Sequence, residues 1–188
     1  SNPANVTWAP LTDNQPTLAV GAIALQPCSI SLTNCDNVNH LSKTTLVGTG
    51  EPNSAIDSYY GLGILRSTDG GNNWLLISSA NGTANSFKGL GFSKIVFNTT
   101  VGKESNVVAA AGSTIGTEDG ARVSGQISGP FVSMDSGVSW AAAPITDGTF
   151  GGTVSPISAT SLIFNANAGP SGTFFMAMRD HGLYSSTD

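Results

Sequence analysis

Short apolar runs separated by turn residues dominate the pattern of this 188-residue chain. Several runs alternate between apolar and polar positions, which is typical of β-strands, and no stretch has a sustained helical period. The pattern therefore predicts an all-β chain made of repeated units. The strands it predicts are 18–25, 44–48, 63–66 and 74–78 in the first unit, 94–98, 106–111, 130–133 and 140–144 in the second, and 161–165, 173–178 and 182–185 in the third, which lacks a fourth run.

One motif recurs at the same place in these units. The pattern S-x-D-x-G-x-x-W occurs at 67–74 and 133–140, a partial copy starts at 186, and a degenerate copy covers 1–8. Both full copies fall between the third and fourth predicted strands of a unit, so they predict hairpins. The residues that define them are Ser67, Asp69, Gly71 and Trp74 in the first copy, Ser133, Asp135, Gly137 and Trp140 in the second, and Asp188 in the partial one.

This motif resembles the Asp-box, or BNR repeat, of β-propellers of the sialidase and sortilin type. The resemblance implies a propeller segment of about three four-stranded antiparallel blades. We expect residues 1–12 to supply a strand of a preceding or closing blade, 13–80 and 81–145 to form blades, and 146–188 to form an incomplete blade. An ordinary propeller has about four to eight blades. We therefore expect a piece of a larger propeller, or two copies that complete one ring.

The resemblance also implies a structural role for each motif residue. The Asp accepts hydrogen bonds from N–H groups of the turn, since a short carboxylate suits a tight turn. The Ser hydroxyl adds a partner, the Gly takes a left-handed backbone, and the Trp packs against the sheet. The carboxylates of Asp69 and Asp135 are accordingly expected to hold turns and not to act in catalysis.

Composition narrows the possible partners. Only 10% of the residues are charged, the net charge is −5, and the seven Lys and Arg residues are scattered. This argues against a nucleic-acid partner, which needs a basic stripe. No apolar run approaches the roughly 20 residues of a membrane span. A glycan or a protein is the expected ligand.

Cys28 and Cys35 flank a six-residue loop. The spacing is not that of a zinc site, because no second pair follows. A disulfide that closes this ring is the favoured interpretation and indicates an oxidising, extracellular compartment; two free thiols are the alternative. Sequons at Asn5, Asn81 and Asn98 are compatible with secretion.

Candidate chemistry gathers in the insertion 48–61, whose G-T-G-E and D-S-Y-Y-G runs resemble a stretch of bacterial BNR-repeat proteins of glycosidase-like annotation. Glu51, Asn53 and Asp57 are weak candidates for Ca²⁺ ligands, since Ca²⁺ takes oxygen donors. Glu51 and Asp57 could instead be a glycosidase carboxylate pair. A polar loop packed by Tyr59 and Tyr60 is the third interpretation.

Sialidases use three arginines, a Tyr with a Glu, and an Asp acid. This chain has only Arg66, Arg122 and Arg179, and neither the R-I-P entry motif nor a nucleophile elbow is present. The resemblance thus carries the fold and not the active site. Two hypotheses follow. The first is a secreted or cell-surface, non-catalytic scaffold that binds a glycan or protein through Tyr59 and Tyr60. The second is part of an Asp-box glycoside hydrolase, sialidase- or xyloglucanase-like, with catalytic residues partly outside this segment.

Overall fold

The computed structural model describes residues 7–28, 35–36, 41–53, 55, 57–113, 127–147, 152–154 and 158–187. Strands alternate with turns and irregular segments, and no helix occurs in this part of the chain. The described residues accordingly contain no helix that could cross a membrane. Their strands form three larger antiparallel sheets and three two-stranded hairpins.

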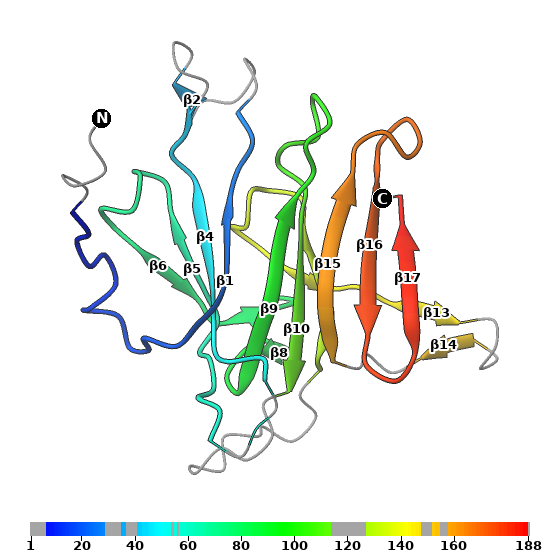
Figure 1. Ribbon diagram of the computed structural model, residues 1–188, viewed down its shortest axis with the longest axis horizontal. Coiled ribbons are helices and arrows are strands. Elements are labelled where there is room, and N and C mark those ends of the chain that lie inside the picture. Colours follow the sequence, from blue (N-terminus) through cyan, green and yellow to red (C-terminus); the bar gives the residue numbers. More distant parts are fainter. Residues whose placement is uncertain are drawn as a thin grey trace.

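The three larger sheets, which we call blades 1, 2 and 3, follow one another along the chain. Their strand orders are β1-β4-β5-β6, β9-β10-β11-β12 and β15-β16-β17. Figure 1 shows the blades side by side, with β9 between β1 and β15. The bounds are β1 Val20–Leu25, β4 Thr45–Thr49, β5 Ile64–Ser67, β6 Leu75–Ile77, β9 Leu90–Phe97, β10 Val107–Ser113, β11 Gly129–Ser133, β12 Ala141–Ala142, β15 Ala159–Asn165, β16 Thr173–Met178 and β17 Gly182–Ser186.

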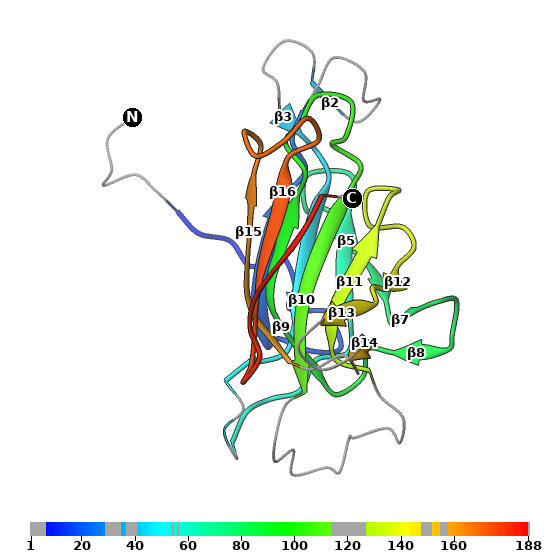
Figure 2. The ribbon, with the colours of Figure 1, turned by 90° about the vertical axis from the view of Figure 1, so that its right-hand side faces the viewer.

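Three hairpins join or flank the blades. Their bounds are β2 Cys35–Asp36 with β3 Leu41–Ser42, β7 Ser79–Ala80 with β8 Asn85–Ser86, and β13 Ile145–Asp147 with β14 Gly152–Val154. Figure 2 shows the second and third hairpins on the same side as β11 and β12. The Asn81 N–H at the tip of the β7–β8 hairpin donates to the Trp140 carbonyl at 2.8 Å. The β7–β8 hairpin is therefore bonded to the segment that leads into β12 of blade 2.

Both faces of blade 2 are buried, and strand β10 shows this residue by residue. Successive side chains of a strand point to opposite faces. Val107, Ala109 and Ala111 belong to the core between blades 1 and 2, whereas Val108 and Ala110 belong to the core between blades 2 and 3. A continuous apolar run is what a strand buried on both faces requires.

An amide side chain crosses each of these two interfaces at the same position of the repeat. Gln26 follows β1 and donates from Nε2 to the Glu104 carbonyl of blade 2 at 3.0 Å. Asn98 follows β9 and donates from Nδ2 to the Ser171 carbonyl of blade 3 at 3.1 Å. Both side chains are more than nine-tenths buried. We call this contact the blade clasp, because it links one blade to the next.

The turn of the second motif docks on blade 1. The Arg66 Nε donates to the Ser136 carbonyl at 2.9 Å, and Gln26 donates to the Ser136 hydroxyl at 2.7 Å. Gly137 has a positive φ of 79°. A Cβ there would lie 2.8 Å from Leu46 Cδ2, so only glycine lets the turn reach blade 1 without a shift of Leu46.

The predicted strands agree with the observed ones except in two respects. Strand β9 begins at Leu90, four residues before the predicted strand. The three short hairpins were not predicted. Residues 7–12 pair with no strand of the three blades. The strand expected within 1–12 belongs to a preceding or closing blade, so this expectation stays a prediction.

Replacing Asn98 with Ala should lower the free energy of unfolding by about 1–3 kcal/mol, because the Ser171 carbonyl and the Thr100 N–H lose a buried partner. Chemical denaturation followed by tryptophan fluorescence measures this loss. Asn167→Ala is the matched control, since Asn167 is an exposed asparagine in the turn after β15. Equal losses for the two variants would contradict the role assigned to Asn98.

Candidate functional site

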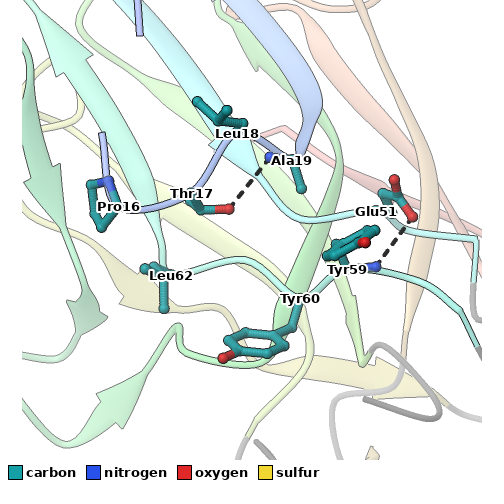
Figure 3. Close-up of a pocket in the computed structure, with 8 residues that line it drawn as sticks. All are labelled: Pro16, Thr17, Leu18, Ala19, Glu51, Tyr59, Tyr60 and Leu62. Carbon is teal, nitrogen blue, oxygen red and sulfur yellow. Dashed lines mark hydrogen bonds between the residues drawn. The ribbon is translucent and has the colours of Figure 1, made fainter. Parts of the chain in front are cut away.

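A cavity of about 520 Å³ opens where β1 begins and β4 ends. Figure 3 shows its wall of aromatic and aliphatic side chains with one carboxylate, Glu51, at the rim. The residues that line it are Pro16, Thr17, Leu18, Ala19, Glu51, Tyr59, Tyr60 and Leu62. The sequence pointed to the loop residues but not to the segment 16–19. Such a segment is found only from contacts between parts of the chain that are distant in sequence.

A buried threonine fixes the base of the loop that carries Glu51 and Tyr59. The Thr49 hydroxyl donates to the Gly63 carbonyl at 2.6 Å and accepts from the N–H groups of Leu62 and Gly63 at 3.0 Å. Thr49 is fully buried. One side chain thereby satisfies three backbone groups, which holds the two ends of the 50–62 loop together.

The glycines on either side of this loop allow close backbone contact with blade 2. The Gly61 N–H donates to the Leu90 carbonyl at 2.8 Å, and the Gly89 N–H donates to the Gly61 carbonyl at 2.9 Å. A Cβ at Gly50 would lie 2.4 Å from the Leu90 carbonyl oxygen, and one at Gly61 would lie 2.6 Å from it. The G-T-G-E and Y-Y-G runs are thus explained by backbone packing.

Glu51 and Tyr59 face each other across the loop. The Glu51 N–H donates to the Tyr59 carbonyl at 2.8 Å, and the Tyr59 N–H donates to Glu51 Oε2 at 3.2 Å. The Tyr59 side chain is 72% exposed. Figure 3 shows its ring beside the Glu51 carboxylate, while the Tyr60 ring lies nearer Leu62. The arrangement offers an accessible aromatic face next to a fixed acceptor.

The other loop candidates lie away from this arrangement. Asn53 and Asp57 are exposed, and neither is among the described residues that line the cavity. Glu51 and Asp57 therefore do not form a carboxylate pair within it. No group of three His, Cys, Asp or Glu residues that could hold a metal occurs among the described residues. The calcium hypothesis remains a prediction.

The two motif hairpins lie at the other end of the blades from the cavity. In each, the Ser hydroxyl donates to the Asp Oδ1, at 2.8 Å for Ser67 and 2.7 Å for Ser133. The same hydroxyls accept the N–H groups of Gly71 and Gly137, both at 2.9 Å. The two copies thus have the same internal network.

Each Asp carboxylate is occupied by donors from its own turn. Asp69 accepts the Asn73 backbone N–H at 2.9 Å and the Asn73 amide at 2.7 Å. These bonds, the backbone one foremost, lower the pKa of Asp69 to about 2. For Asp135, partial burial raises the pKa, but hydrogen bonds from Ser139, Ser133 and Val138 outweigh it, and the pKa falls below its usual value. These carboxylates hold the turns.

The motif tryptophans differ in their surroundings. Trp140 is buried, and its Nε1–H donates to the Gly137 carbonyl at 3.2 Å. Trp74 is half-buried, and Trp8 of the degenerate copy is 93% exposed. Asp188 lies outside the described residues.

The cysteines and sequons are only partly described. Cys28 is not a free thiol. The side chain of Cys35 lies outside the described residues, so its pairing with Cys28 remains a prediction. Asn81 is an exposed sequon in a turn, Asn98 is buried within the blade clasp, and Asn5 is not described.

Comparison with known proteins identifies the architecture. Neither a family model nor a curated protein sequence matches the chain. Among solved structures, an ancestral GH74 enzyme superposes with a TM-score of 0.53 and 21% identity. GH74 enzymes are β-propeller glycoside hydrolases. The fold is that of a β-propeller. The match covers 89% of this chain and 17% of the enzyme, so the chain spans about a sixth of that protein's length.

Acid should weaken the first motif hairpin. The pKa of Asp69 is about 2 in the folded chain and about 3.9 in an unfolded one. The carboxylate therefore contributes stability that is fully present above about pH 5 and is lost as the pH falls toward 2. Thermal unfolding of the native chain and of Asp69→Asn should show a gap in Tm at neutral pH that narrows in acid. Asp13→Asn, at an exposed position outside the hairpins, is the control. A gap that stays constant with pH would contradict this role.

Proposed function

We propose that this chain is part of an Asp-box β-propeller that binds a carbohydrate in the cavity lined by Glu51, Tyr59 and Tyr60. The observation that carries the proposal is the exposed Tyr59 ring beside a carboxylate that its own N–H holds in place. An aromatic face packs against the apolar C–H face of a sugar ring. An ionised carboxylate accepts hydrogen bonds from sugar hydroxyls.

The dimensions of the cavity suit such a ligand. Its volume of about 520 Å³ lies within the roughly 300–1,000 Å³ of small-molecule sites. Leu18, Ala19 and Leu62 supply apolar walls. The sparse charge of the chain also favours an uncharged glycan over a polyanion. We further propose that the protein works outside the cell, which the cysteine pair and the exposed sequon at Asn81 support.

The second candidate is part of a glycoside hydrolase, and the fold shared with the ancestral GH74 enzyme favours it. In that case Glu51 would be one carboxylate of the pair, and residues beyond this segment would supply the other. Binding without hydrolysis is our first choice, because Glu51 is the one carboxylate among the described residues of the cavity wall.

Tyr59→Ala should weaken glycan binding about tenfold or more, because it removes the stacking surface and leaves the fold intact. Glycan-array screening of the native chain, then calorimetry with the best ligand, provides the measurement. Trp8→Ala is the control, since Trp8 is an aromatic side chain even more exposed than Tyr59 and is not part of the cavity wall. Absence of binding to any glycan would contradict the proposal.

Glu51→Gln separates the two candidates, since the amide keeps the size of the side chain and removes its charge. If the site only binds, affinity should fall several-fold, and neither protein should cleave the glycan. Product analysis by mass spectrometry checks this. Cleavage by the native chain that Glu51→Gln abolishes would overturn the non-catalytic proposal in favour of the hydrolase.

A further inference from the structure

Equivalent residues of successive blades make the contacts at both interfaces. The same positions can be located on the two outer faces of the described fold. Each blade has a trailing face, turned toward the next blade along the chain, and a leading face, turned toward the previous one. The strand pairing aligns three residues on the trailing face of each blade, one from each of its first three strands. These residues are Ala24–Leu46–Arg66 in blade 1, Val96–Val108–Val132 in blade 2 and Ile163–Phe175–Ser185 in blade 3.

The trailing face of blade 3 has the composition of a covered face but is open. Ile163 and Leu183 are 59% and 71% exposed. Leu183 pairs with Ala177, as Ile64 of blade 1 pairs with Gly48, and Ile64 is fully buried against blade 2. The same registers are thus buried in blade 1 and exposed in blade 3.

The leading face of blade 1 is exposed along β1 but not along β4 and β5, where Val47 and Leu65 are buried in the single chain. Ile23 and Leu25 are each 66% exposed. Their counterparts in blade 2, Ile95 and Phe97, have the same registers against β10 and are almost completely buried. Large exposed apolar patches of this kind mark contact surfaces. One chain therefore carries both halves of a blade-to-blade interface.

The blade clasp also recurs at the open end. Asn165 pairs with Thr173 at the register that Gln26 and Asn98 occupy after their strands. Its Oδ1 accepts the Asn167 N–H at 3.0 Å, just as Asn98 Oδ1 accepts the Thr100 N–H at 2.8 Å. The Asn98 Nδ2 donates its hydrogen bond to the next blade. Asn165 is exposed and makes the same local bond, without a described partner for its Nδ2.

We propose that a second copy of this chain covers these surfaces, with the leading face of its blade 1 on the trailing face of blade 3. The support for this assignment is that the new contact would repeat the register of the two interfaces already present between blades 1 and 2 and between blades 2 and 3. Used twice between two chains, the contact closes a ring of about six blades, within the usual range for propellers. The proposal requires Leu11, which lies against Gly71 on the leading face, to give way to Phe175, the counterpart of Leu46. The proposal is independent of the glycan site.

Sedimentation velocity and light scattering over a concentration series test the assembly. The native chain should reach twice its 19.1 kDa mass. A trailing variant, Ile163→Lys with Leu183→Lys, and a leading variant, Ile23→Lys with Leu25→Lys, should each stay monomeric. All four positions are exposed in the single chain, so folding is preserved. Val101→Lys, at an exposed apolar position in a turn, is the control and should still dimerise.

Mixing the two variants decides the orientation. The leading face of one and the trailing face of the other remain intact, so the mixture should form a heterodimer through one interface. Asn165→Asp keeps the acceptor and removes the donor, and should weaken association about three- to tenfold, the worth of one hydrogen bond. A native chain that is monomeric at every concentration, or a variant that dimerises by itself, would overturn the proposal.

Discussion

Close packing of small side chains between sheets is the constraint on which this structure depends. Strand β10 has the sequence V-V-A-A-A-G-S, and both of its faces are covered. Alanines at successive positions let blades 1 and 3 approach blade 2. Larger side chains of the neighbouring blades fill the space: Leu46 and Ile64 of blade 1 on one side, Met176 of blade 3 on the other. Larger side chains in β10 would separate the blades and expose both cores.

Polar contacts then set the register that apolar packing leaves undefined. The blade clasp and the Ser136 turn bind backbone carbonyls or a hydroxyl at fixed points of the neighbouring blade. A slip of one residue would leave these buried amides unpaired, which is costly in an interior. The second motif hairpin therefore has two roles. The Asp135 carboxylate holds its turn, and the turn presents the Ser136 backbone to blade 1.

Much of the fold could be predicted from sequence because its determinants are local. Short alternating runs mark the strands, and Asp69 and Asp135 bond mainly within their own turns. The β7–β8 hairpin escaped prediction because its two-residue strands are mostly polar. The start of β9 did as well, since Gly91 resembles a turn signal. The cavity was predicted only in part. Glu51 and Tyr59 lie in one motif, but Leu18 and Ala19 reach them through tertiary contacts.

The burial of Asn98 has a consequence for how the protein can be produced. Its amide nitrogen, the atom to which an oligosaccharide would be attached, points into the seam with blade 3 and is bonded there. A sugar added to the nascent chain would stand where Ser171 must come to rest, so modification at this sequon and closure of that seam exclude each other. A host that glycosylates this asparagine before folding would thus yield chains whose last sheet cannot dock, whereas a sugar on Asn81 would extend harmlessly into solvent.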